Sequence, residues 1–166
     1  RFTDMASLKQ QTVISKYTDT AKECIREEPP YVFQYKNSPF IIAYSAKLDN
    51  KLTGHRCGER ISYSGFIRME AFSYTVEKVK NITGLTFSTL FIETCNAEYR
   101  LHSIMSEVFR EENRINLTDT EGRSHSFPAN NIVLFISNTS SAASLIIQSY
   151  IHLYGIPQIS HASSSS

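Results

Sequence analysis

A run of small hydroxyl residues separates an apolar stretch from a helical pattern in the last third of the chain. The segment SNTSSAAS, from Ser137 to Ser144, follows the apolar run NIVLFIS. The first turn of a helix has backbone N–H groups without intrahelical partners and carries the positive end of the helix dipole. Small side chains let an anion approach those groups, and Ser140 and Ser141 can add hydroxyl hydrogen bonds. The segment therefore predicts either an anion-binding turn or an ordinary helix cap followed by a small packing face.

A second hydroxyl-rich turn closes the chain. The residues SHASSSS, 160–166, follow the short apolar segment IPQISH. If both apolar segments are strands of one parallel sheet, their carboxyl ends lie at the same edge. The two turns would then converge on one small polar ligand, whereas the alternative for 160–166 is a flexible end.

A single arginine could supply the opposite charge. Arg68 lies in SGFIRMEAF, one position before Met69 and two after Phe66, at the edge of an apolar stripe. A guanidinium in this place can form a bidentate pair with a carboxylate ligand. The alternative is a solvated arginine, or one paired to Glu70 or another nearby acid.

Hydrophobic periodicity predicts the elements that position these residues. Four short apolar runs rich in β-forming residues predict strands, and the third has no polar alternation, as expected when both faces are covered. They are Phe40–Ala46, Leu85–Thr94, 131–137 and 156–161. Apolar residues at spacings of three and four predict amphipathic helices between the strands. The first stripe is Phe66, Met69, Phe72, Val76 and Val79, and the second is Tyr99, Leu101, Ile104, Met105 and Val108. A third helix is expected at 139–155 and stops at Gly155.

The alternation of strands and helices predicts an α/β fold with a parallel sheet and helices on both faces. Ligands of such sheets bind outside the carboxyl ends of the strands. The segments expected there are 45–65, 95–97, 137–141 and 160–166.

Two stretches lack a clear pattern. Residues 1–38 are polar, and the neighbouring stretch EEPPYVFQYKNSP holds three of the five prolines, which predicts an irregular flanking segment. The polar segment from Glu112 to Asn130 contains Gly122 and Pro128, which predicts a long surface loop.

Composition limits the classes of function. The chain has 166 residues, 41% hydrophobic content and a formal net charge of +1, which gives no electrostatic case for nucleic-acid binding. No apolar run approaches the roughly 20 residues that a membrane span needs. The first residue is Arg1, from which we expect a processed chain or a piece of a longer protein.

Cysteines and glycan acceptors favour an extracellular setting. The cysteines are Cys24, Cys57 and Cys95, an odd number that leaves one thiol over if two of them pair. Acceptor motifs of the N-x-[ST] type occur at Asn81, Asn116 and Asn138, although such short motifs also arise by chance.

Motifs of known enzyme classes are missing from the sequence. It contains no G-x-S-x-G, H-E-x-x-H, C-x-x-C, P-loop or G-x-G-x-x-G. The five histidines are scattered, and nothing is spaced as a catalytic triad or a metal site would be. We therefore expect a protein that is not an enzyme and that holds no metal or cofactor.

Two blocks resemble one family. The block CGERISYSGFIRMEAFSYTVEKVKNITGLTFSTLFIETC is similar to the opening of the extracellular ligand-binding domain of class C G-protein-coupled receptors, with the metabotropic glutamate receptors as the nearest match. Its matching features are the Cys-Gly-Glu start, the helix pattern Gly-x-x-Arg-x-Glu-Ala, the turn Asn-Ile-Thr and the final Thr-Cys. The second block, SSAASLIIQSYIHLYGIPQISHASSSS, resembles the family's serine turn, helix, Ile-Pro-Gln strand and final hydroxyl turn.

The resemblance implies a fold and a division of the chain. The family domain is a two-lobed clamshell, the Venus flytrap, of the type found in periplasmic binding proteins. Residues 39–166 correspond to the first part of lobe 1, with the rest of the clamshell missing, and residues 1–38 show no match. A disulfide between Cys57 and Cys95 is implied, and Cys24 is the odd cysteine.

The resemblance also implies a ligand set for an α-amino acid. Ser141 and the backbone of its turn, with Ala142, would receive the α-carboxylate. Ser164 would receive the α-amino group, with Ala162 and Ser163 in the same turn. Arg68 would pair with the distal carboxylate of a glutamate-like ligand. A glycan on Asn138 would obstruct this pocket, so we expect glycans only at Asn81 and Asn116.

The function implied is that of a membrane receptor ectodomain on the outer face of the plasma membrane. Amino-acid binding would close the lobes, and closure would act on a transmembrane domain and its G protein outside this segment, with a homodimer formed through lobe 1. Ser64 and the final serines depart from the family pattern, as do the glycines missing from the turn after the third strand. The alternatives are another clamshell receptor, such as a receptor guanylate cyclase or the amino-terminal domain of an ion channel, and a doubly wound small-molecule enzyme.

Overall fold

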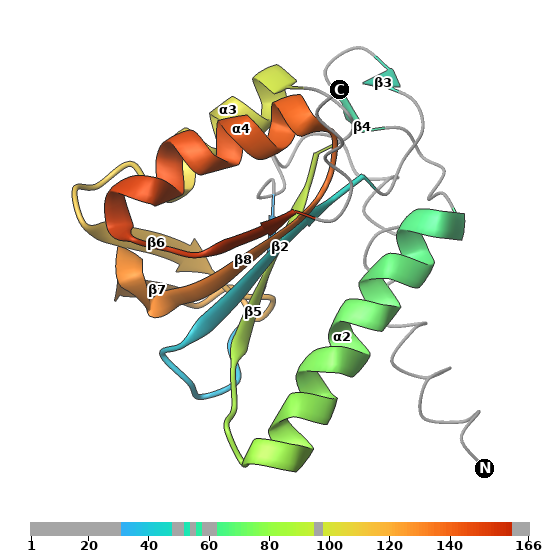
Figure 1. Ribbon diagram of the computed structural model, residues 1–166. Helices are drawn as coiled ribbons and strands as arrows, with labels where there is room; N and C mark the ends of the chain where they lie inside the picture. Colours follow the sequence, from blue (N-terminus) through green and yellow to red (C-terminus); the bar gives the residue numbers. More distant parts are fainter. Residues whose placement is uncertain (1–30, 48–51, 54–55, 58–62, 95–97, 161–166) are drawn as a thin grey trace.

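The computed structural model describes residues 31–47, 52–53, 56–57, 63–94 and 98–160. Its centre is a five-stranded sheet with the strand order β1-β5-β2-β8-β9 (Figure 1). The strands are β1 (Tyr31–Gln34), β5 (Ser88–Glu93), β2 (Ile41–Ala46), β8 (Ile132–Asn138) and β9 (Gln158–Ser160). The pairs β5–β2, β2–β8 and β8–β9 are parallel, whereas β1 runs antiparallel to β5. The predicted α/β fold with a mostly parallel sheet is therefore confirmed.

Helices cover both faces of this sheet, as Figure 1 shows. The helix α2 (Tyr63–Thr83) packs on one face, and α3 (Glu98–Val108) and α4 (Ser141–Ile151) lie side by side on the other. None of these helices is long and apolar enough to cross a bilayer, within the residues that the structure describes.

Strand β2 shows why the apolar runs predict a covered sheet. All six of its residues are buried. Ile41 and Ala43 join the core under α3 and α4, whereas Tyr44 faces α2. The Tyr44 ring stacks on Phe72 of α2, with 4.7 Å between the ring centroids. The period of two along a strand thus sends alternate side chains into two different cores.

The helical stripes were predicted with small errors. Phe72 and Val76 of α2 are buried as expected, but the helix continues through the Asn-Ile-Thr turn and ends at Thr83. In α3 the stripe is buried except for Tyr99, which is 53% exposed. Gly155 has φ +66 and follows a 3-10 turn at the end of α4, which confirms its predicted role as a left-handed helix stop.

Two segments differ from the sequence-based expectation. The predicted loop at 112–130 contains an antiparallel hairpin of β6 (Arg114–Thr118) and β7 (Ser124–Pro128). Its apolar side chains, Ile115, Leu117 and Phe127, are buried in the α3–α4 core. Part of the segment expected to be irregular, Tyr31–Gln34, is the edge strand β1. In both places a short alternation of apolar and polar residues supplies the strand, although turn residues surround it.

Candidate functional site

The carboxyl ends of the parallel strands are aligned at one edge of the sheet. Ala46 of β2 is the register partner of Glu93 in β5 and of Asn138 in β8, and Ser137 of β8 is paired with Ser160 of β9. The chain therefore leaves these strands at the same edge of the sheet, where open α/β sheets bind ligands. The turn from β8 to α4 lies within the described residues, whereas the segments after β5 and β9 do not.

Ser140 forms the cap of α4. Its backbone is extended, its Oγ accepts a hydrogen bond from the Ala143 N–H at 3.3 Å, and its carbonyl accepts the Ser144 N–H at 3.0 Å. Ser141 is the first residue of the helix and is half-buried, and Ala142 is exposed beside it. The helix cap is thus confirmed, and the binding of an anion at the same turn stays a prediction. The same geometry leaves the positive end of the α4 dipole at Ser141 and Ala142.

A set of four hydroxyl groups, three of them on buried residues, joins β8, α4 and β9. Ser137 Oγ lies 2.8 Å from Thr139 Oγ1 and 3.0 Å from Ser144 Oγ, and Ser144 Oγ lies 2.9 Å from Ser160 Oγ. Ser137, Thr139 and Ser144 are at most 7% exposed. We call these four residues the hydroxyl network. Sequence reasoning missed it because only Ser140 and Ser141 were singled out from this serine-rich stretch.

Ser45 extends the polar row into the sheet. It is the register partner of Ser137 across the β2–β8 pair. Ala43 and Phe135, two residues earlier in each strand, both belong to the α4-facing core, so Ser45 and Ser137 lie on that same face. Ser45 Oγ is fully buried and forms no hydrogen bond among the described residues. A buried hydroxyl without a hydrogen-bond partner costs about 1–3 kcal/mol of folding free energy. Ser45 is therefore an unfavourable residue at a position whose role is packing alone.

An open groove of about 460 Å³ runs between α4 and the edge strand β9. We call it the α4–β9 groove. Ser141, Ser144 and Ser160 line it, and Ile151 and Ile156 make part of its apolar wall. Its lining includes no Asp, Glu, Lys or Arg among the residues that the structure describes. Hydroxyl and amide groups and the His152 side chain, with the positive end of the α4 dipole near Ser141, therefore set its polarity.

Arg68 lies elsewhere on the described surface. It is exposed in α2, on the opposite face of the sheet from α4. Figure 1 places the beginning of α2 toward the carboxyl ends of the strands. No hydrogen bond or ion pair joins Arg68 to another described residue, so the alternative of a pair with Glu70 is not seen and a solvated side chain fits the described surroundings. A meeting of Arg68 with Ser141 around one ligand stays a prediction.

Most of the other expected site residues lie outside the part of the chain that the structure describes. Ala162, Ser163 and Ser164 lie outside the described residues, as does Cys95. Cys57 is in the short strand β4 (Arg56–Cys57), paired with β3 (Leu52–Thr53), but its side chain is not described, so the disulfide with Cys95 stays a prediction.

The two expected glycan acceptors lie on the surface. Asn81 is exposed near the end of α2, and Asn116 is exposed on β6. Both amides are therefore open to solvent, and their glycosylation stays a prediction.

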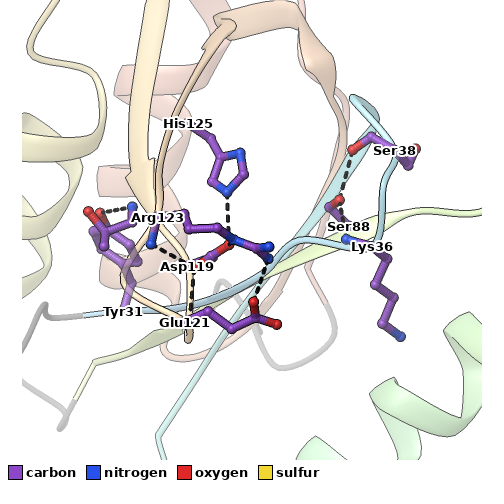
Figure 2. Close-up of polar contacts among 9 residues, drawn as sticks. Tyr31, Lys36, Ser38, Ser88, Asp119, Glu121, Arg123 and His125 are labelled. Atoms are coloured by element: carbon purple, nitrogen blue, oxygen red, sulfur yellow. Dashed lines mark hydrogen bonds and ion pairs between the residues drawn. The ribbon is translucent and has the colours of Figure 1, made fainter.

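A second polar cluster, drawn in Figure 2, holds the tip of the β6–β7 hairpin. The side chain of Asp119 is only 2% exposed, and its carboxylate lies 2.8 Å from both Arg123 Nε and His125 Nε2. It also accepts the backbone N–H groups of Glu121 and Arg123 at 2.9 Å. Because a carboxylate only accepts, His125 donates through Nε2. Burial alone would raise the pKa of Asp119, but the bonds from His125, Arg123 and Glu121 hold it well below its usual range.

This cluster has the features of a structural turn. Each polar group of Asp119 is paired within the hairpin, and the Tyr35 ring covers His125 with 4.3 Å between the ring centroids. No group of three His, Cys, Asp or Glu side chains suits a metal ion within the described part of the chain. The carboxyl edge of the sheet, with the α4–β9 groove, therefore remains the better candidate site.

Comparison with known proteins gives one informative similarity. No family model matches the sequence. The metabotropic glutamate receptor of Drosophila melanogaster is 27% identical over 124 residues, which cover 68% of this chain and 13% of that receptor. The chain thus spans a small part of the relative's length. At this identity and coverage, the similarity supports a receptor-related domain.

Proposed function

We propose that this chain is the opening part of lobe 1 in the extracellular ligand-binding region of a class C receptor, and that it binds an α-amino acid. The similarity to a metabotropic glutamate receptor supports the receptor class. The observation that carries the ligand is the position of Ser141: it begins α4 at the carboxyl edge of the parallel sheet, directly beside the end of β9.

The chemistry of this edge suits a zwitterion. An α-carboxylate fits at Ser141 and Ala142, where the α4 dipole and a hydroxyl meet. The α-amino group would be received by Ala162, Ser163 and Ser164, which follow β9 in the sequence and lie outside the described residues. Arg68 would pair with a second, distal carboxylate of the ligand. The proposed ligand is therefore glutamate-like.

The wider role follows from the receptor class. Closure of two lobes around the amino acid would act on a transmembrane domain and its G protein, both outside these residues, at the outer face of the plasma membrane. A homodimer through lobe 1, glycans at Asn81 and Asn116, and a Cys57–Cys95 disulfide belong to the same proposal, which needs no cofactor.

Isothermal calorimetry on the full-length protein that carries this chain tests the proposal with a panel of α-amino acids. Charge-assisted bonds contribute about 1.5–3 kcal/mol each. Ser141→Ala should therefore weaken binding of every amino acid about tenfold or more. Arg68→Ala should weaken glutamate by a similar factor and leave alanine unchanged. Ser149→Ala, on the exposed side of the same helix, is the matched control for Ser141, and Arg110→Ala is the control for Arg68.

Three results would count against it. Absence of binding for all amino acids removes the function and favours a different clamshell receptor or an enzyme. Equal glutamate affinity in Arg68→Ala removes the distal-carboxylate contact alone. Equal affinities in Ser141→Ala and Ser149→Ala remove the α4 turn from the site.

A further inference from the structure

The outer edge of strand β1 is covered by the turn of the β6–β7 hairpin. Phe33 forms an isolated parallel bridge with Asp119, and its carbonyl accepts the Thr120 N–H at 3.1 Å. Among the described strands, β1 pairs only with β5, so the contacts with the turn lie on the opposite edge of β1. We call residues 119–123 the strap.

The rest of the hairpin fastens the strap to β1. The Tyr31 hydroxyl accepts the Thr118 N–H at 3.2 Å, one residue before the strap. The rings of His125 and Phe127 on β7 pack edge-on against the Phe33 ring, with centroid distances of 5.8 and 5.9 Å. Phe33 is only 1% exposed, so the hairpin and the sheet together enclose it.

Asp119 gives the strap its shape. Its backbone carbonyl accepts the Gly122 N–H at 2.9 Å, which closes a β-turn with Thr120 at the second position. Its carboxylate accepts the backbone N–H groups of Glu121 and Arg123 and the Arg123 side chain. The Thr120 N–H bonds to β1, outside this turn, so the turn and the cover over β1 depend on different backbone groups.

Strand β1 needs a cover because its own sequence favours pairing with another strand. Its four residues, Tyr31–Gln34, include three with high strand propensity and none with a charge. Uncovered strand edges of this kind pair with other chains through their N–H and C=O groups. Natural sheets block such edges with charges, very short strands or a covering loop, and the strap is a covering loop.

We propose that the strap guards the edge of β1 against pairing with β1 of a second copy of this chain, and that Asp119 holds the strap in place. The bond from Thr120 to Phe33 is the contact that a second strand would have to replace. The strap is a property of this fold and does not depend on the ligand or the receptor class of the proposed function.

Substitution of Thr120 tests the strap while preserving its turn. Proline suits the second position of a β-turn and has no N–H, so Thr120→Pro removes the bond to Phe33. Thr120→Ala is the matched control, because it keeps the N–H. In hydrogen exchange of the 166-residue chain, the 31–34 amides should exchange about tenfold faster in Thr120→Pro, with β2 and β8 unchanged. Thr120→Ala should match the wild type. Wild-type exchange at 31–34 in Thr120→Pro, or an equal rise throughout the sheet, overturns the strap.

Sedimentation velocity over a range of protein concentrations tests the second copy. Thr120→Pro should form species larger than those of the wild type, whatever the wild type's own assembly state, and Thr120→Ala should not. Gln34 is exposed on β1, and a lysine there disfavours edge pairing. Adding Gln34→Lys to Thr120→Pro should therefore restore the wild-type distribution, while exchange at 31–34 stays fast. Larger species that persist in the double variant, or none in Thr120→Pro, overturn the pairing of β1 edges.

A variant of Asp119 tests the strap without relying on how proline fits the turn. Asp119→Asn keeps every backbone N–H but removes the charge that pairs with Arg123. The 31–34 amides should again exchange faster than in the wild type. Glu121→Gln, which removes an exposed partner of Arg123, should leave them at the wild-type rate. Wild-type exchange in Asp119→Asn would show that the carboxylate does not hold the strap.

Discussion

Ser144 Oγ lies 2.9 Å from Ser160 Oγ, so a helix on one face of the sheet is bonded through side chains to the last residue of the edge strand. Most side-chain hydrogen bonds in proteins go to backbone or water, and a buried run of hydroxyl–hydroxyl contacts is less common. Here the run crosses from β8 through α4 to β9. The contact thus links β8, α4 and β9 at the carboxyl edge of the sheet, although β9 contributes only three residues.

The two neighbouring serines of the polar row should respond to mutation in opposite ways. Ser137→Ala removes two hydroxyl contacts and should lower the free energy of unfolding by about 1–2 kcal/mol. Ser45→Ala removes a hydroxyl that has no hydrogen-bond partner among the described residues, so stability should be unchanged or rise by about 1 kcal/mol. Urea denaturation of both variants measures the difference. If Ser45→Ala lowered the free energy of unfolding as much as Ser137→Ala does, the Ser45 hydroxyl would have to form a stabilising hydrogen bond, which contradicts the prediction.

The contact between α4 and the sheet depends on Phe135 of β8, which is fully buried in the same core as Ile147 of α4. Phe135→Ala leaves a cavity and should destabilise the fold by about 3–5 kcal/mol. Leu145 lies on the same helix but is 65% exposed, so Leu145→Ala should cost less than about 0.5 kcal/mol. Chemical denaturation compares the two, and similar losses would show that α4 does not pack on the sheet through the face described.

Asp119 should make the stability of the hairpin depend on pH. Its pKa is lower in the folded chain than its ordinary value of about 3.9. The folded state therefore binds fewer protons than the unfolded state, and the stabilisation is complete above about pH 5 and lost as the pH falls below 4. Asp119→Asn should lower the melting temperature at pH 7, and the gap to the wild type should narrow at pH 3.

The control for this prediction is Glu121→Gln, which removes an exposed partner of Arg123. Exposed ion pairs contribute little, so its melting temperature should stay close to the wild type at both pH values. A gap between Asp119→Asn and wild type that is the same at pH 3 and pH 7 would show that the Asp119 charge is not responsible.

Gly155 should resist substitution because of its backbone alone. Its φ is +66, and a Cβ added there meets no atom within 4 Å. Gly155→Ala should therefore cost about 1–2 kcal/mol through the left-handed conformation. Gly155→Asn should cost less, since asparagine tolerates this region better. Thermal denaturation of the two variants gives the order, and an alanine variant as stable as wild type would contradict the conformation.

The proposed disulfide predicts one cross-linked peptide. Digestion without reduction should yield a fragment that joins Cys57 to Cys95, with Cys24 recovered separately as the odd cysteine. Cys57→Ser and Cys95→Ser should each lower stability by about 2–4 kcal/mol, and the double variant should lose no more than either one. Additive losses, or a peptide that contains Cys24, would remove this pairing.

The apolar runs carried most of the information about the fold. Ile41–Ala46 and Ile132–Asn138 are strands because mostly apolar runs, rich in β-branched and aromatic residues, suit a sheet covered on both faces. Short alternations were harder to recognise, since Ile115 and Leu117 stand among turn-forming residues and a glycan acceptor. Their burial depends on contact with the distant strand β1 and helix α3, which no local pattern reports.

The candidate site was predicted only in part. The position of Ser141 at the start of a helix follows from its local sequence, and the structure places it there. The bond between Ser144 and Ser160 depends on the register of β8 with β9 and on the rotation of α4 about its axis. Neither can be read from a single sequence, since a one-residue slip in register would send Ser160 to the other face.

The position of β1 has a consequence for how the chain acquires its fold during synthesis. Tyr31–Gln34 leave the ribosome before their partner in the sheet, β5, which is made only after α2. The Tyr31 hydroxyl also accepts the Thr118 N–H, from a hairpin that is made later still. The first of the described strands to be translated is therefore completed late, and a nascent chain halted before the hairpin would hold an edge strand that lacks its final contacts.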